Sequence, residues 1–518
     1  MSAGGDSAEV TFGTAAGRWV IAVTVMGSGM AFLDSTVVNV ALPEIGRDFD
    51  ATTESLQWIL NGYLLTLASL ILLGGALGDR YGRRRVFVAG VGLFTVASAF
   101  CAAAPSDELL VAARLLQGVG GALLTPGSLA MIEAGFRPGD RARAIGAWSG
   151  LGGVATALGP LLGGYLVDAV SWRAIFLINL PIGVFVIAMA RRHVPETRDR
   201  GAAGQRVDYR GAALAALGLA GTTYALIQAP EAADPLPALV VGALGLAALV
   251  AFVLVERTTR SPMLPLGLFS SRQFTAANLV TFAVYAALAG FFFLFVAFLQ
   301  VSMGYSAIAA GAVTLPVTAL MLGLSARAGM LAQRIGARIP LTLGPAVIAA
   351  GLLWMTRLEP GDDYLTAILP PVIVFGIGLT LVIAPVTATV LAAADSSHAG
   401  IASGVNNAVA RVAGLLAVAV LPFAAGLTGD AFYDPESMTG GFQMAMAVCA
   451  VLAAVGGVLA WLTVSGDVLE AEPDEDGDTP DRAAEDYSCG VAGTPLRPAR
   501  EARCSQREDV RRPERIGV

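Results

Sequence analysis

Fourteen apolar runs divide this chain, and each is about long enough to cross a lipid bilayer as one helix. Hydrophobic residues make up 55% of the 518 residues and charged residues only 14%, which excludes a soluble globular protein. The runs lie near residues 18–42, 57–78, 86–104, 108–134, 143–167, 172–190, 211–229, 236–256, 274–299, 307–332, 340–358, 365–393, 401–427 and 441–464. The sequence therefore predicts an all-α polytopic membrane protein with fourteen transmembrane helices.

An arginine-rich loop between the second and third runs is repeated later in the chain. The first copy, G-A-L-G-D-R-Y-G-R-R-R, spans Gly75 to Arg85, and a degenerate copy, G-M-L-A-Q-R-I-G-A-R, spans Gly329 to Arg338. The second copy begins 254 residues after the first and has Gln333 in place of Asp79. One copy in each half predicts two homologous helix bundles. The same offset pairs the ninth run with the first, so the runs at 211–256 are predicted to be an insertion.

The runs and the repeat together predict five segments. They are an N-terminal segment at 1–17, a six-helix bundle at 18–192, a connecting region at 193–273 with two extra transmembrane helices, a second six-helix bundle at 274–464 and a tail at 465–518. The tail is first acidic and then rich in arginine, a composition that predicts disorder. Two interpretations of its basic part stay open, a solvated chain and a contact with the membrane surface or a partner.

The distribution of charge predicts the orientation in the membrane. Arginines gather in alternate loops, for example at Arg83, Arg84, Arg85 and Arg141, and the opposite loops are mostly acidic. Positive charge near helix ends resists translocation, so the arginine-rich loops are expected in the cytoplasm. Because the number of helices is even, both termini are expected there too. The protein is predicted to be a multi-pass protein of the cell inner (plasma) membrane.

Two charged residues stand inside apolar runs at similar depth. Asp34 lies roughly 13 Å inside the first run and Arg114 about 10 Å inside the fourth, counting 1.5 Å per residue. A carboxylate at that depth is costly unless it is paired, hydrated or protonated, which makes it a candidate for function. The approach of a guanidinium favours the ionised carboxylate and its withdrawal favours protonation, so the pair is a candidate for proton coupling. An ion pair that only holds two helices together is the alternative.

Other polar side chains in apolar runs are candidates for a substrate pathway. They are Asn39, Asn61, Gln117, Asn179, Asn278, Tyr285, Gln300, Asn406 and Arg411. Arg411 is predicted either to bind an anionic group, to pair with a carboxylate or to cap a backbone carbonyl. No acidic residue stands out within the helices of the second bundle, so the sequence does not identify its partner.

Several motifs resemble those of the major facilitator superfamily. The loop at Gly75–Arg85 resembles the superfamily's G-x-L-a-D-r-x-G-r-k, and R-L-L-Q-G-V-G-G-A from Arg114 resembles a motif of proton-driven members. The runs L-D-S-T-V-V-N-V-A-L-P from Leu33 and A-L-G-P-L-L-G-G-Y from Ala157 resemble the fourteen-helix drug:proton antiporter branch. The resemblance implies the major facilitator fold, two six-helix bundles plus two inserted helices.

The resemblance also implies two groups of functional residues. The antiporter motif of helix five is carried by Gly146, Gly159, Pro160, Gly163 and Gly164, although Ala155 replaces one of its glycines. A conformational latch is carried by Gly75, Asp79, Arg80, Gly82 and Arg83. Asp79 is expected to reach the start of the thirteenth helix, near Gly400 and after Asp395, Ser396 and Ser397, while the cytoplasmic side is closed.

Together these features predict a proton-coupled exporter of amphipathic or lipophilic drugs and antibiotics. A dedicated exporter of one endogenous metabolite or siderophore is one alternative, and a non-transporting membrane sensor on the same fold is another. No G-x-x-x-x-G-K-[ST] loop for nucleotide occurs, and Cys101, Cys449, Cys489 and Cys504 lack metal-site spacing. We therefore expect neither an enzyme nor a metal site or cofactor, but a monomer whose partners are a small-molecule substrate, protons and the bilayer. We expect no nucleic acid partner.

Overall fold

The computed structural model describes residues 10–198, 207–259, 261–394, 399–466 and 468. The described part is nearly all helical, and fourteen of its helices are long and apolar enough to cross a membrane. The tail at 470–518 lies outside the described residues. The helices are α1 (Ala15–Phe49), α2 (Thr53–Tyr81), α3 (Arg83–Ala103), α4 (Asp107–Gly135), α5 (Pro138–Ala169), α6 (Ala174–Leu177), α7 (Asn179–His193), α8 (Tyr209–Gln228), α9 (Leu236–Thr258), α10 (Arg272–Val301), α11 (Ala307–Val313), α12 (Leu315–Ile335), α13 (Arg338–Met355), α14 (Leu369–Ala392), α15 (Ala399–Ala424) and α16 (Pro435–Thr463). Short helical turns η2 (Leu266–Ser270), η3 (Tyr364–Ile368) and η5 (Gly429–Phe432) lie in the connections.

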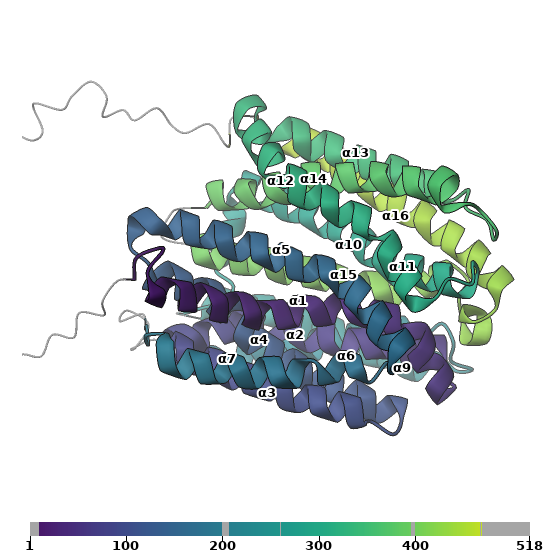
Figure 1. Cartoon of the computed structure of the whole chain (residues 1–518), viewed down its shortest axis with the longest axis horizontal. Helices are drawn as coiled ribbons and strands as arrows, with labels where there is room; N and C mark the ends of the chain where they lie inside the picture. Colours follow the sequence, from purple (N-terminus) through teal and green to yellow (C-terminus); the bar gives the residue numbers. More distant parts are fainter. Residues whose placement is uncertain (1–9, 199–206, 260, 395–398, 467, 469–518) are drawn as a thin grey trace, which may run out of the picture. The chain divides into compact units, whose positions relative to one another are not determined.

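The helices before and after the insertion pack in the same pattern. Helix α2 packs on α4 as α12 packs on α14, α3 on α4 as α13 on α14, and α1 on α5 as α10 on α15. In Figure 1, α1, α2, α3 and α4 lie beside one another, as do α12, α13, α14 and α16. We call α1–α7 the first bundle and α10–α16 the second bundle. The bundles contact each other chiefly where α2 meets α15 and α5 meets α11.

Paired glycines show the repeat at the level of single residues. A methyl group on Gly90 of α3 would lie 2.9 Å from the Gly120 carbonyl oxygen of α4, and one on Gly344 of α13 would lie 3.1 Å from the Gly378 carbonyl oxygen of α14. Both contacts are closer than a Cβ ordinarily approaches a carbonyl oxygen, so glycine suits both positions. The two bundles therefore share the same close approach of two helix backbones.

The repeated loop is shorter than the sequence suggested. Helix α2 continues through Asp79 to Tyr81, so the turn before α3 consists of Gly82 alone, with φ at 111°. Gly336, which lies 254 residues further on, has φ at 82° before α13. Backbone in this region is strained for residues with a Cβ, which explains why both copies keep a glycine there.

Three of the predicted helices differ from the structure: one ends later than predicted, and two are broken. Helix α1 does not end at Pro43 but continues to Phe49, where Asp50 follows in the left-handed conformation. The tenth run breaks at Thr314 into α11 and α12, and the sixth breaks at Ile178 into α6 and α7. Each break lies just before a proline, Pro316 or Pro181, which has no N–H for the helical hydrogen bond to the preceding turn.

The two inserted helices lie at the side of the bundles. Helix α8 packs on α9 and also contacts α2 and α15. Most of α9 is exposed, including Leu239, Leu244 and Leu254. An apolar, exposed helix in a membrane protein suits a lipid-facing position.

The molecule has two ends of opposite charge. The first turns of α3 and α5 carry Arg83, Arg84 and Arg141, and we call this the arginine-rich end. The other end, where α1 and α5 finish, carries Asp48, Asp168 and Asp430, and we call it the acidic end.

Candidate functional site

Asp34 and Arg114 form an ion pair inside the first bundle. The Arg114 guanidinium donates through Nη1 to Asp34 Oδ2 at 2.5 Å, and both side chains are only 1% exposed. The pair joins α1 to α4, as counting residues from the helix ends had predicted. A buried pair of this kind is stable only when its remaining polar atoms are also satisfied.

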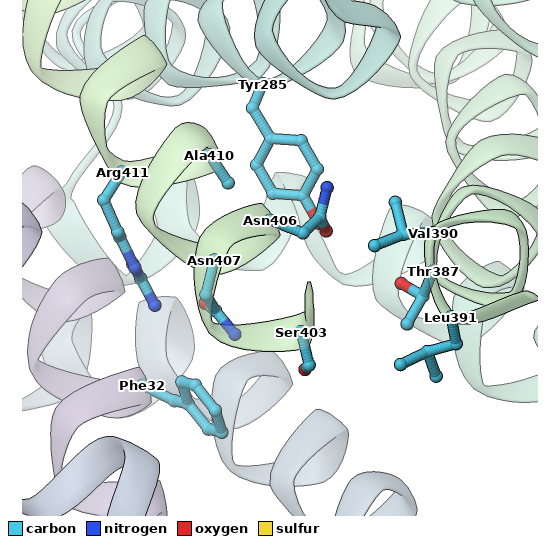
Figure 2. Close-up of a pocket in the computed structure, with 10 residues that line it drawn as sticks. All are labelled: Phe32, Tyr285, Thr387, Val390, Leu391, Ser403, Asn406, Asn407, Ala410 and Arg411. Carbon is cyan, nitrogen blue, oxygen red and sulfur yellow. The ribbon is translucent and has the colours of Figure 1, made fainter. Parts of the chain in front are cut away.

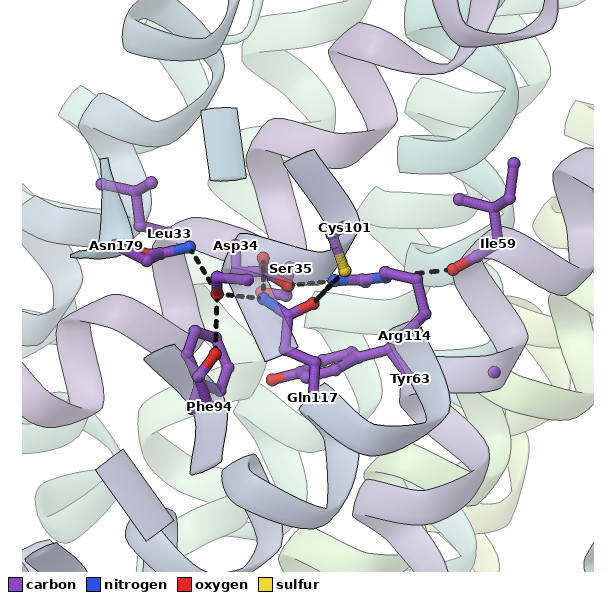
Figure 3. Close-up of polar contacts among 12 residues, drawn as sticks. Leu33, Asp34, Ser35, Ile59, Tyr63, Phe94, Cys101, Arg114, Gln117 and Asn179 are labelled. Carbon is purple, nitrogen blue, oxygen red and sulfur yellow. Dashed lines mark hydrogen bonds and ion pairs between the residues drawn. The ribbon is translucent and has the colours of Figure 1, made fainter. Parts of the chain in front are cut away.

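Gln117 completes the site on the next turn of α4. Its Nε2 donates to Asp34 Oδ1 at 2.8 Å and to Ser98 Oγ at 2.9 Å, and its Oε1 accepts from Arg114 Nη1 at 2.6 Å. Asn179 of α7 donates to the same Ser98 hydroxyl at 3.4 Å. Figure 3 shows these side chains converging from α1, α3, α4 and α7. Both oxygens of the Asp34 carboxylate are therefore held by donors from α4.

Arg114 is fixed by three further neighbours. Its Nε donates to the Ile59 carbonyl oxygen at 3.1 Å, and its guanidinium lies 4.5 Å from the centre of the Tyr63 ring and 5.8 Å from that of Phe176. A cation over an aromatic face gains electrostatic stabilisation away from water. The charge of Arg114 is thus supported by groups from α2 and α6 as well as by Asp34.

Among its described residues, the second bundle has no counterpart of this ion pair. Gly378 of α14 corresponds to Gly120 of α4. Counting back from these two glycines, Val372 and Phe375 of α14 occupy the positions of Arg114 and Gln117 in α4. Phe375 packs on Phe291 of α10, with ring centroids 4.2 Å apart. Of the two bundles, the first carries the ionisable centre and the second a core of phenylalanines.

A cavity of about 250 Å³ lies between the bundles. Figure 2 shows its lining residues, which come from α1, α10, α14 and α15. They are Phe32, Tyr285, Thr387, Val390, Leu391, Ser403, Asn406, Asn407, Ala410 and Arg411. The lining combines apolar walls with several amide and hydroxyl groups and one guanidinium.

The nine pathway candidates fall into three places. Tyr285, Asn406 and Arg411 line the cavity, and Asn278 lies behind Asn406, accepting a 3.2 Å hydrogen bond from its Nδ2. Four others lie within the first bundle and do not line the cavity, namely Asn39, Asn61, Gln117 and Asn179. Gln300 instead joins the bundles, because its Nε2 donates to the Val40 carbonyl oxygen at 2.9 Å.

The sequence did not identify Phe32, Thr387, Val390, Leu391, Ser403 or Asn407 as lining residues. Ser403 and Asn407 stand in G-I-A-S-G-V-N-N (Gly400–Asn407), so their polarity was a usable signal. Phe32, Val390 and Leu391 are apolar residues in apolar helices, and nothing in the sequence separates them from residues that face lipid.

Hydrogen bonds close the acidic end of the molecule. Asp168 of α5 accepts from Ala307 N at 3.1 Å and from Ile308 N at 2.9 Å, and Gln57 of α2 donates to the Val418 carbonyl oxygen at 2.8 Å. Thr53 donates to the Gly429 carbonyl oxygen at 2.8 Å. These hydrogen bonds join the two bundles and lie in the same half of the molecule.

A tyrosine also spans the acidic end. Tyr433, between η5 and α16, donates its hydroxyl to the Ala51 carbonyl oxygen at 2.8 Å. Burial raises the pKa of Tyr433 to about 12, so the phenol stays neutral and keeps its proton for this bond at physiological pH.

The glycines of α5 divide into two groups. A methyl group on Gly164 would lie 2.4 Å from Ile308 Cα of α11, and one on Gly159 would lie 2.0 Å from Thr36 Oγ1 of α1. A methyl group on Gly163 would lie 2.9 Å from Val37 Cγ1 of α1. Gly146, near the arginine-rich end, has nothing within 4 Å of such a methyl group. Helix α5 is therefore tightly packed at the acidic end and open at the arginine-rich end.

The predicted latch residues lie at the end of α2. Asp79 binds Arg83 one turn further on, with 2.7 Å between Oδ1 and Nη2, and Arg83 also donates to the Ala130 carbonyl oxygen at 3.1 Å. The expected partner is the start of α15 near Gly400, and the residues just before it, Asp395, Ser396 and Ser397, fall outside the described residues. Arg80 lies over the Tyr81 ring, 5.3 Å from its centre.

Comparison with known proteins decides the family. Residues 24–418 match the Major Facilitator Superfamily. The chain belongs to this superfamily. The Multidrug resistance protein Stp of Mycobacterium tuberculosis is similar to it, with 36% identity over 403 residues that cover 77% of this chain and 74% of that protein. Also similar is the Tetracenomycin C resistance and export protein of Streptomyces glaucescens, with 35% identity over 417 residues that cover 80% and 76%.

Solved structures show the same fold. A crystal structure of a D-xylose-proton symporter aligns with a TM-score of 0.57 at 14% identity, covering 87% of this chain and 98% of the symporter chain. These comparisons confirm the family and the fold that the motifs predicted. Membership indicates a multi-pass membrane transporter.

Proposed function

We propose that this protein is a proton-coupled exporter of amphipathic or lipophilic drugs and antibiotics that works by alternating access. The observation that carries the proposal is that two features lie in different places. A buried carboxylate lies in the first bundle, and a cavity with apolar and polar walls is lined mainly by the second bundle. The names of the similar proteins, which include multidrug resistance and export, support the direction of transport. We take the arginine-rich end to face the cytoplasm, because positive charge near helix ends resists translocation.

In this conformation the Asp34 carboxylate contacts the Arg114 guanidinium and is buried, so a proton would reach it only after the guanidinium moves away. Helix α1 connects this step to the substrate cavity, because Phe32 lines the cavity two residues before Asp34. The Tyr63 ring of α2 lies against the same site, 4.5 Å from the Arg114 guanidinium. A movement of α1 would change both sites together.

Alternating access requires the acidic end to open. The contacts of Asp168, Gln57, Thr53 and Tyr433 between the bundles would then break, while the arginine-rich end closes. Each neutral hydrogen bond contributes only about 0.5–1.5 kcal/mol net, so a set of this size can be exchanged for contacts at the other end. The cavity lies between the bundles, where rocking of one bundle against the other would expose it to each side in turn.

Efflux measurements test this proposal directly. Everted membrane vesicles containing the full chain should accumulate compounds from a panel of drugs when a proton gradient is present and lose them when a protonophore removes it. Accumulation of several unrelated compounds supports multidrug export, and accumulation of only one endogenous metabolite or siderophore supports a dedicated exporter. Vesicles that bind compounds but never accumulate any would support the sensor and contradict the proposal.

The latch makes a separate prediction about conformational balance. If Asp79 binds the start of α15 when the arginine-rich end closes, Asp79→Asn removes about 1 kcal/mol from that state, or roughly a fivefold shift in population. We expect slower export and faster labelling, from the arginine-rich end, of a cysteine introduced by Ser403→Cys. Gln333→Ala, at the uncharged second copy, is the matched control and should change little. Equal labelling rates with and without Asp79→Asn would contradict the latch.

A further inference from the structure

The substrate cavity contains a single charged side chain, and that charge is positive. Of the ten residues that line the cavity, Arg411 is the only ionisable one apart from the neutral phenol of Tyr285. Arg411 stands twelve residues into α15, about 18 Å from its start at 1.5 Å per residue. A guanidinium so far from the membrane surface is costly and marks a functional position by default.

Arg411 has no counter-ion among the described residues. No ion pair or hydrogen bond of its side chain is present in the part of the chain that the structure describes. The buried carboxylate of Asp34 is already held by Arg114 and Gln117. The described parts of α10 and α14, which form the cavity with α15, contain no Asp or Glu. Of the three roles that the sequence left open, the described residues support the binding of an anionic group, because they offer Arg411 neither a carboxylate nor a carbonyl partner.

Two further polar residues share one stripe of α15 with Arg411. Ser403, Asn407 and Arg411 are spaced four residues apart, so their side chains lie above one another on one helix face. All three line the cavity (Figure 2). The Asn407 side chain has no hydrogen-bond partner within the described ranges, so its amide N–H groups are free to donate beside the guanidinium. Asn406, by contrast, already donates to Asn278 and to Thr281.

The opposite walls of the cavity suit an apolar body. Phe32 of α1 and Val390 and Leu391 of α14 are lining residues, and the Tyr285 ring lies at the centre of the view in Figure 2. A cationic compound would need a carboxylate here and would instead meet Arg411, at an energetic cost in a medium of low dielectric. An anionic compound would supply the missing counter-ion and place its apolar body against these walls.

We propose that the substrates of this protein are amphipathic organic anions, with a carboxylate or similar acid on a flat apolar body, and that Arg411 selects them together with Asn407. The proposal rests on the proposed exporter function but concerns the charge of what is carried. It predicts a preference within any set of compounds that differ only in charge.

Three probes with one ring system provide that set. Anthracene carboxylate, anthracene carboxamide and aminomethyl anthracene are similar in shape but negative, neutral and positive at neutral pH. Binding to the purified full-length protein in lipid nanodiscs can be followed by fluorescence anisotropy. We expect the carboxylate to bind tightest. Arg411→Gln should weaken carboxylate binding by about ten- to a hundredfold and leave amide binding within about twofold.

Two other variants control for charge and for folding. Arg411→Lys keeps the charge and should retain part of the preference, losing the two-pronged contact that a guanidinium makes with a carboxylate. Arg338→Gln removes a guanidinium that lies over the Trp461 ring outside the cavity, and it should change nothing. Unchanged amide binding shows that Arg411→Gln is folded. If that variant does not fold, the binding of the three probes to the wild-type protein still tests whether the protein prefers anions.

The outcomes separate this inference from the proposed function. Binding of the amine or amide as tightly as the carboxylate, or no binding of any probe to the wild-type protein, would overturn the anion proposal. Everted vesicles that take up the amine in response to the gradient, with no preference for the carboxylate, would support the proposed exporter function. The same result would contradict the proposal that the substrates are anions. Carboxylate binding that depends on Arg411, with no gradient-driven uptake of any probe, would support the anion site. It would contradict proton-coupled export.

Discussion

Asp34→Asn is expected to abolish accumulation driven by a proton gradient while the protein remains folded. The amide keeps the shape of the carboxylate, and its oxygen can still accept from Arg114, but it cannot bind and release a proton. Removing one partner of a buried ion pair typically costs about 3–5 kcal/mol, and the retained hydrogen bond should keep the loss below that. Uphill transport should therefore fall to background, and membrane abundance should fall much less.

The measurement compares uphill and downhill transport in proteoliposomes. Substrate exchange without a gradient needs no proton and should survive in Asp34→Asn, whereas accumulation against a concentration difference should not. Asp48→Asn is the matched control, because it makes the same change near the end of the same helix, where Asp48 binds Arg173 at 2.7 Å on the surface. Undiminished uphill transport by Asp34→Asn would remove this carboxylate from the coupling mechanism.

The sequence could predict this ion pair because membrane helices fix depth. Each transmembrane helix starts near one surface, so counting 1.5 Å per residue places Asp34 and Arg114 at a common level. Two opposite charges at one level of a low-dielectric interior have a strong reason to meet. The role of Gln117 as a third member needed the structure, because its position one turn after Arg114 fixes the level but not which donor faces the carboxylate.

Depth does not determine which way a side chain faces. The sequence groups Asn61 and Asn179 with Tyr285 and Asn406, because all four are polar residues in apolar helices. In the structure Asn61 and Asn179 are buried within the first bundle, whereas Tyr285 and Asn406 line the cavity. Without a solvent-facing polar side, a helix in lipid has little amphipathic signal by which to assign its faces. The bounds of α1 and α12 were missed for a related reason. Apolar runs continue across prolines, and only packing decides whether the helix continues through Pro43 or restarts before Pro316.

Gly164→Ala is expected to shift this protein toward a state that is open at its acidic end. The added methyl group would lie 2.4 Å from Ile308 Cα and 2.5 Å from the Ala307 carbonyl oxygen, and both are backbone atoms that cannot rotate away. Overpacking of this kind costs about 1–3 kcal/mol, here only in the conformation that closes α5 on α11. Each 1.4 kcal/mol changes the ratio of the two states about tenfold, so the closed acidic end should become the minor state if the two states are otherwise close in energy.

Labelling of a cavity cysteine from each side measures that shift. With the four native cysteines replaced and Ser403→Cys added, a membrane-impermeant thiol reagent should react faster from the acidic end and slower from the arginine-rich end when Gly164→Ala is present. Gly311→Ala should act in the same direction, because its methyl group would lie 2.2 Å from the Pro160 carbonyl oxygen across the same contact. Gly146→Ala is the control on α5, since nothing lies within 4 Å of its added methyl group. If Gly164→Ala labels like Gly146→Ala from both sides, the contact between α5 and α11 does not hold the acidic end closed, and the hydrogen bonds of Gln57 and Thr53 from α2 to the second bundle must do so instead.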